Sequence, residues 1–147
     1  MKPRLIVVAA AGLALAAAGA TASAAPQAAA AHEKIATEQT SLGRVLAGPD
    51  GKVMYLFEAD KTNKSGCNPL CQSFWPPIVS SGAPLAGAHV SAAHLGRTKT
   101  GQVTYYGRPL YGYVMDTKSK QTSGEGSGAW GGKWYVVGTN GKAIKSS

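Results

Sequence analysis

Two aspartates end two copies of one hexamer, and they are the first candidates for chemistry. Residues 55–60 (YLFEAD) and 111–116 (YGYVMD) both read Tyr, any residue, aromatic, two residues, Asp. An aspartate at the end of a strand accepts backbone N–H bonds from the turn that follows, and we expect this role for Asp60 and Asp116. The alternative is that both carboxylates converge on one cation or ligand, helped by oxygens from nearby polar loops.

Cys67 and Cys71, which are the only cysteines, form a Cys-x-x-x-Cys pair. In an oxidising compartment such a pair predicts a local disulfide that pins the following loop against the core. The alternatives are a redox pair or, with His89 and His94, a zinc site. The spacing is not that of thioredoxin-type motifs, and the gap from Cys71 to His89 is longer than in zinc fingers. We therefore predict a disulfide, with no metal and no cofactor.

Aromatic residues offer a third kind of site. Trp75 and Trp134 follow the two hexamers at corresponding places, and we expect both in the core. Trp130 lies in a glycine-rich loop, so we predict that it is exposed and forms a candidate ligand surface for glycan rings or proline-rich peptides. No histidine lies beside a Ser or Cys nucleophile in the sequence, and we predict that the protein is not an enzyme.

The N-terminus reads as an export signal. Lys2 and Arg4 precede an uncharged apolar run from residue 5 to 20, and small residues follow at 22–24. At about 1.5 Å per residue such a helix is shorter than a hydrocarbon core of roughly 30 Å, which favours a signal peptide over residues 1–24. The mature chain is then secreted, periplasmic or in the cell envelope, with no integral membrane segment after cleavage.

The mature chain is basic. Cleavage removes Lys2 and Arg4 and leaves 13 basic and 7 acidic side chains, a net charge of +6. Such a charge favours anionic envelope polymers or lipid headgroups, and a surface protein is another possible partner. The lysines are scattered and do not alternate with stacking aromatics, so we predict no nucleic-acid partner.

Repetition and turn signals predict the fold. We expect a disordered tether over 25–41, then one β domain over 42–147 made of repeats at about 42–94 and 95–147. Short apolar segments separated by Gly-rich turns predict hairpins around 48–51, 107–108 and 139–141, and a helical turn is suggested only at 91–95. The predicted class is mainly β, a small single domain with a pseudo-twofold relation.

The alternation of residues along each predicted strand places the aromatic side chains. Tyr55 and Phe57 point to one face of their strand, and Tyr111 and Tyr113 to one face of the equivalent strand. We expect these four rings to meet in a common interior.

The doubled hexamer, the preceding Asp-Gly turn and the Cys-x-x-x-Cys-x-x-x-Trp-Pro-Pro run resemble the bacterial secreted-repeat family of unknown function, whose members are small predicted lipoproteins. The resemblance spans about residues 42–147 and implies an exported, two-repeat envelope protein with no assigned activity. The chain departs from the family in two ways. No cysteine near the predicted cleavage site could carry a lipid, and the second copy has Glu125 near the place of Cys67.

These observations together predict an exported, non-catalytic envelope protein with a structural or surface-binding role. The alternative function is a small periplasmic redox or metal-handling protein that uses the Cys67–Cys71 loop, together with Met54, Met115 or the histidines.

Overall fold

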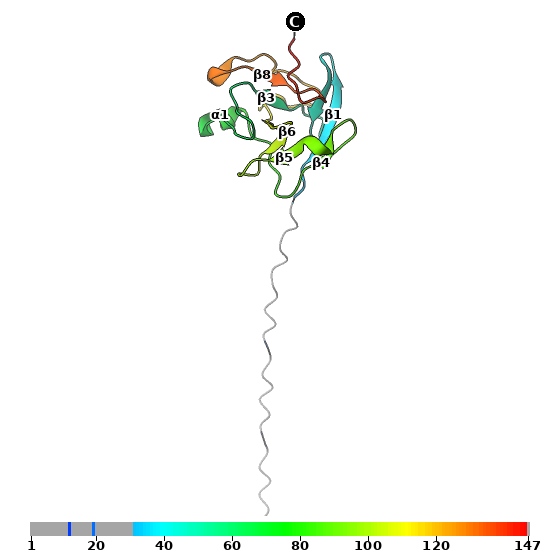
Figure 1. Ribbon diagram of the computed structural model, residues 1–147, viewed down its shortest axis with the longest axis vertical. Coiled ribbons are helices and arrows are strands. Elements are labelled where there is room, and N and C mark those ends of the chain that lie inside the picture. The colour runs from blue at the N-terminus through cyan, green and yellow to red at the C-terminus, as the bar shows by residue number, and fades with distance from the viewer. Residues whose placement is uncertain (1–11, 13–18, 20–30, 147) are drawn as a thin grey trace, which may run out of the picture.

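The computed structural model describes residues 12, 19 and 31–146. The predicted signal peptide, residues 1–24, falls outside the described residues except for two isolated positions. Residues 25–30 of the predicted tether also fall outside them. The fold described below is therefore that of residues 31–146, which form the globular part in Figure 1.

The structure is mainly β, as the sequence predicts, and it is a small single domain with three short sheets. The sheets have the strand orders β2-β1-β4, β3-β8 and β5-β6-β7. The strands are β1 (Lys34–Thr40), β2 (Gly43–Ala47), β3 (Tyr55–Phe57), β4 (Leu85–Ala86), β5 (Leu95–Arg97), β6 (Val103–Tyr105), β7 (Arg108–Pro109) and β8 (Trp134–Val136), and the helices are α1 (Pro69–Phe74) and the 3₁₀ turns η1 (Ala92–His94) and η2 (Ala129–Gly131).

Strand β1 corrects the predicted tether. Residues 34–40 pair with β2 in antiparallel register and with β4 in parallel register, so the described part of the 25–41 segment is folded. Ile35, which is fully buried, is the large apolar residue that fixes the strand to the core. The other positions of β1 are polar or small, and the strand is held by backbone hydrogen bonds. A search for apolar periodicity does not detect a strand of this kind.

The predicted turns are present, although one hairpin pairs differently. Tyr106 and Gly107 have φ of 49° and 75° and join β6 to β7, which is the left-handed geometry of a two-residue hairpin. The turn at 139–141 closes with Gly138 N–H donating to the Lys142 carbonyl. The 48–51 turn also forms, but the regular partner of β3 is β8 and that of β2 is β1.

The second hexamer is not the strand that the sequence predicts. Tyr111 makes isolated bridges to Tyr55 and Pro77, and the chain then turns at Val114 and Met115. Both residues of this turn are exposed, and the first hexamer turns at the equivalent residues, Glu58 and Ala59. A local turn, closed by the Asp116 N–H that donates to the Tyr113 carbonyl, therefore stands where the sequence predicts that the strand continues.

The core has two layers of side chains separated by β3. Tyr55 and Phe57 point into one cluster, whereas Met54 and Leu56 point into the other. In the first cluster Trp134 stacks on Trp75 with ring centroids 4.0 Å apart and on Phe57 at 4.2 Å. Both Trp75 and Trp134 are fully buried, as predicted, and they form the centre of the domain.

The four motif aromatics do meet in this cluster. The ring of Tyr55 lies edge-on to that of Tyr113, with centroids 6.1 Å apart, and Tyr111 lies edge-on to Trp134 at 5.0 Å. Phe57 reaches the same Trp134 from the other repeat. Tyr113 is half-buried, whereas the other three rings are buried completely.

Helix α1 was not predicted. Asn68 caps it by accepting the Cys71 N–H at 2.9 Å, and Pro69 occupies the first helical turn. An Asn-Pro pair is a helix-start signal, since the Asn side chain accepts a free N–H and proline fixes the backbone torsion. Only six residues follow this signal before the helix ends, which is too short for a helical pattern of apolar residues.

Candidate functional site

The two motif aspartates are joined to the motif tyrosines in a crossed arrangement. The Tyr55 hydroxyl donates to Asp116 Oδ2 at 2.5 Å, and the Tyr111 hydroxyl donates to Asp60 Oδ2 at 2.7 Å. Each bond therefore links a tyrosine of one hexamer to the aspartate of the other. The backbones of Tyr55 and Tyr111 are also paired through two hydrogen bonds, which hold the two tyrosines side by side.

The second carboxylate oxygen of each aspartate holds the loop that follows it. Asp60 Oδ1 accepts the Gly66 N–H at 2.6 Å, and Asp116 Oδ1 accepts the Ser123 N–H at 3.0 Å. These bonds are of the kind expected for aspartates that start turns. Within residues 31–146 no cluster of three or more His, Cys, Asp or Glu side chains could hold a metal ion.

Burial shifts the pKa values of three groups in these pairs. It raises the pKa of Asp60 above the ordinary range, although the Gly66 N–H, the Tyr111 hydroxyl and the nearby Arg108 charge act in the opposite direction. It also raises the pKa values of Tyr55 and Tyr111, which keeps both hydroxyls protonated as hydrogen-bond donors. The pairs therefore work as structural clamps between the two halves of the chain.

Cys67 and Cys71 are joined by a disulfide, and both are buried. The bridge ties the start of α1 to the chain before it, and the Gln72 side chain donates to the Cys67 carbonyl at 2.9 Å. The bonded sulfurs are not thiolates and so do not serve as zinc ligands. Of the histidines considered with them, His94 stacks on Tyr106 at 3.8 Å, in a part of the surface near β6.

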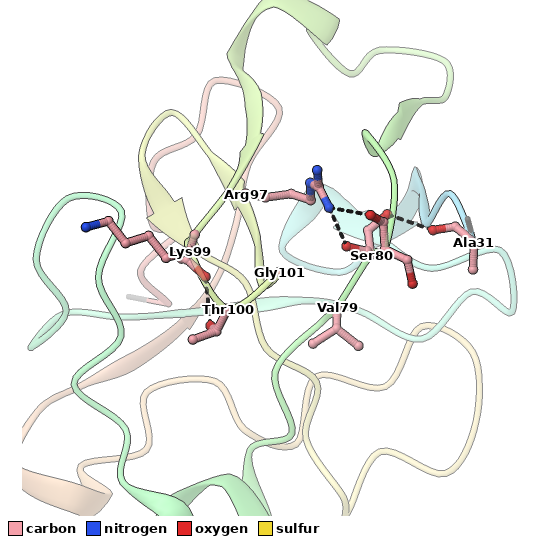
Figure 2. Close-up of a pocket in the computed structure, with 9 residues that line it drawn as sticks. Ala31, Val79, Ser80, Arg97, Lys99, Thr100 and Gly101 are labelled. Carbon is pink, nitrogen blue, oxygen red and sulfur yellow. Dashed lines mark hydrogen bonds between the residues drawn. The ribbon is translucent and has the colours of Figure 1, made fainter. Parts of the chain in front are cut away.

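Two adjoining pockets form a basic cleft, which no sequence signal pointed to. Their volumes are about 520 and 670 Å³, and they share Val79, Thr98, Lys99 and Thr100. Figure 2 shows the first pocket, in which Lys99 extends away from Arg97 on the far side of the turn. We use the name basic cleft for both pockets. Their remaining lining residues are Ala31, Asn63, Lys64, Ser65, Cys67, Gln72, Pro77, Ser80, Ser81, Arg97, Gly101 and Gln102.

The charged side chains that line the basic cleft are all cationic. Lys64 and Lys99 are exposed, and Arg97 donates to the carbonyls of Ser80 and Ser81, which orders its guanidinium (Figure 2). Among the described residues, none that lines the cleft carries a carboxylate. The ion pairs found within residues 31–146 use Lys120 and Lys145, so the lysines of the cleft keep their charge uncompensated.

Tight turns place the cationic side chains of the basic cleft. The chain between β5 and β6 turns at 98–101, where Gly101 has φ of 88° and its N–H donates to the Thr98 carbonyl at 3.0 Å. Lys64 closes a second turn through reciprocal backbone bonds with Lys61. The sequence contains both turns, but nothing in it shows that they line the same pocket.

A third pocket, of about 590 Å³, has the opposite character and is called the acidic pocket. Glu33, Asp50 and Asp116 line it, together with Lys52. Burial and the neighbouring Asp50 charge raise the pKa of Glu33. One motif aspartate, Asp116, thus lines the acidic pocket. The other Tyr–Asp pair borders the basic cleft through Ser65, whose hydroxyl is hydrogen-bonded to that of Tyr111 at 2.6 Å.

The predicted ligand residue Trp130 lines a small aromatic cleft on the other side of α1. Trp130 and Phe74 are 37% and 47% exposed, and their ring centroids are 5.8 Å apart. The cleft that they line has a volume of about 250 Å³ and includes Trp75, Tyr113, Ser127 and Ala129 in its walls. Trp130 is therefore accessible, and Phe74 is a second exposed ring that the sequence interpretation placed in a pinned loop.

Comparison with known proteins gives one match. Residues 96–138, which include the second hexamer, match the sequence model of a family described as a secreted repeat of unknown function. No curated protein and no solved structure matches the chain. In the part of the chain that the structure describes, none of the helices has the length and apolar character needed to cross a bilayer.

Proposed function

We propose that this protein is exported and binds anionic polymers of the cell envelope through the basic cleft, without catalysis. The observation that carries the proposal is the pair of adjoining pockets lined by Lys64, Lys99 and Arg97 with no described carboxylate in their walls. The match to a family described as secreted supports export. The net charge of +6 in the mature chain favours the same class of partner.

The chemistry of the cleft fits binding. Two ammonium groups on opposite turns attract anions over distances of about a Debye length, roughly 8–10 Å at moderate salt. Side chains of Asn63, Gln72 and Thr98 add amide and hydroxyl groups for hydrogen bonds at short range. Among the described lining residues there is no histidine or carboxylate to act as a general base, which supports a binding role over hydrolysis.

A charge-matched pair of double variants tests the proposal. We expect Lys64→Glu/Lys99→Glu to weaken binding of the mature protein to long-chain polyphosphate by about tenfold or more at low salt. The control Lys118→Glu/Lys142→Glu has the same net charge and alters exposed lysines outside the basic cleft, and we expect it to retain most of the affinity. Titration by fluorescence anisotropy with labelled polymer provides the measurement.

Two results would contradict this function. Equal losses in both double variants would show that net charge alone attracts the polymer and that the cleft has no special role. Absence of binding by the unmodified protein, at low salt, would remove the proposal altogether.

A further inference from the structure

We infer that the anionic polymer is an acidic polysaccharide. One of its sugar rings binds in the aromatic cleft, and the carboxylates of neighbouring sugar units reach the basic cleft. This inference rests on the proposed function and names the class of its ligand. It comes from the position of α1, which has Gln72 in the wall of the basic cleft and Phe74 in the wall of the aromatic cleft.

The two clefts are close enough for one polymer. Helix α1 has six residues, so at about 1.5 Å per residue it is roughly 9 Å long. Figure 1 shows α1 at the edge of the domain, with the η2 loop on one side of it. A chain that runs along α1 therefore meets aromatic rings at one end and lysines at the other within a few sugar units.

The aromatic cleft offers the kind of surface that a sugar ring needs. The C–H face of a pyranose is flat and apolar, and it packs against the π-face of an exposed aromatic ring. Trp130 and Phe74 are tilted by 36° from each other, and they line the cleft together with the stacked rings of Trp75 and Tyr113. Ser127 in the wall of the cleft supplies a hydroxyl for the polar edge of the sugar.

Both walls of the aromatic cleft are held rigidly. Trp130 has a left-handed backbone, with φ of 67° and ψ of 26°, which is strained for a bulky residue. The indole N–H of Trp134 fixes the loop by donating to the Ala129 carbonyl at 3.0 Å. On the other wall, Val114 N–H donates to the Phe74 carbonyl at 3.0 Å. A preformed cleft loses little conformational freedom on binding.

Charge distinguishes an acidic polysaccharide from other occupants of the aromatic cleft. Lys133 follows the same loop, and its Nζ lies near Gly128, so a cation is present here too. A neutral glycan would leave Lys64 and Lys99 unused, and polyphosphate has no apolar face for Trp130. A proline-rich peptide would use the rings but not the lysines.

Three polymers separate ring recognition from charge recognition. Polygalacturonate has sugar rings and carboxylates, its methyl ester has the rings without the charge, and polyphosphate has the charge without rings. We expect the mature protein to bind polygalacturonate at least about tenfold more tightly than either of the others. Equal affinity for the methyl ester and the acid would overturn the requirement for charge.

Substitutions then assign each contribution. We expect Trp130→Ala, and separately Phe74→Ala, to lower polygalacturonate affinity about tenfold and to leave polyphosphate affinity unchanged. Tyr106→Asn is the matched control, since it removes a ring that is 44% exposed and lies outside both clefts. Asparagine tolerates the positive φ at that position.

The outcomes distinguish this inference from the proposed function. If the two aromatic variants bind polygalacturonate as the unmodified protein does, the inference fails while the basic cleft stands. If they lose both polymers equally, the rings do not select sugars, and the inference also fails. If Lys64→Glu/Lys99→Glu leaves both polymers bound, the proposed function itself is wrong. Thermal unfolding of each variant checks that the fold is retained.

Discussion

The two Tyr–Asp pairs consist of the same residue types but have different surroundings. Asp116 and Tyr55 lie under the loop that contains Gly124, whose N–H donates to the Tyr55 hydroxyl at 3.2 Å. Asp60 and Tyr111 lie beside Ser65, whose hydroxyl bonds to Tyr111 and lines the basic cleft. The Tyr55 hydroxyl thus meets a backbone N–H, and its partner Asp116 borders the acidic pocket, whereas the Tyr111 hydroxyl meets a side chain of the basic cleft.

This difference shows how repeated sequence acquires separate roles. The clamp is retained in both halves because each buried carboxylate needs a donor. The surroundings are free to differ, because the loops after Asp60 and Asp116 have unrelated sequences apart from a Ser-Gly pair. The loop after Asp60 contains the disulfide and α1, and thereby forms part of the two clefts for which we propose binding.

The largest expected effect comes from the glycines of these Ser-Gly pairs. A Cβ on Gly124 would lie 2.6 Å from Cη2 of Trp75, whose ring is stacked on Trp134 and cannot move away. We expect Gly124→Ala to lower the free energy of unfolding by about 3 kcal/mol. Chemical denaturation measures this loss.

The equivalent substitution at the other pair is the control. A Cβ on Gly66 would lie 3.5 Å from Asp60 Oδ1, which is ordinary contact, and we expect Gly66→Ala to cost less than about 0.5 kcal/mol. Similar losses at Gly66 and Gly124 would show that the two loops are equally tight, contrary to the comparison.

The next effect compares the tyrosines. Tyr55→Phe removes the donor to Asp116 and the acceptor for the Gly124 N–H, both in the buried pair, so we expect a loss of about 2 kcal/mol. For Tyr111→Phe we expect about 1 kcal/mol, because solvent in the basic cleft and the Ser65 hydroxyl are close to the exposed side of that pair. Denaturation curves for both variants provide the comparison, and a reversed order would contradict it.

The smallest effect is a change in pH dependence. Because burial raises the folded-state pKa of Asp60 above its unfolded value, the resulting stabilisation is complete below about pH 4, the ordinary Asp pKa, and is lost as pH rises through the folded value. We expect Asp60→Asn, which cannot titrate, to flatten the decline of unfolding free energy over mildly acidic pH. Parallel pH profiles of the variant and the unmodified protein would show that Asp60 does not contribute.

The sequence was sufficient for the fold class and the aromatic core, because these depend on local signals. Alternation along residues 54–57 correctly assigned the two faces of β3, and glycine-containing turn sequences located the turns near 48–51, 107–108 and 139–141. The burial of Trp75 and Trp134 followed from their equivalent places after the two hexamers.

What the sequence did not predict depends on contacts between distant segments. Strand β1 is stabilised by backbone pairing with β2 and β4, which leaves no apolar pattern beyond Ile35. To predict the crossed Tyr–Asp bonds, one would have to know how the two halves of the chain pack together. The basic cleft combines residues from near 64, 72 and 99, and no local rule brings these together.

The crossed bonds also bear on how the chain comes apart. Since Tyr55 donates to Asp116 and Tyr111 donates to Asp60, neither half contains the hydroxyl donor that its own buried carboxylate uses. Separating the halves would break both Tyr–Asp hydrogen bonds and the stacking of Trp75 on Trp134. We therefore expect the two halves to unfold as a single cooperative unit. A cut in the segment that connects them should leave fragments that fold only when both are present.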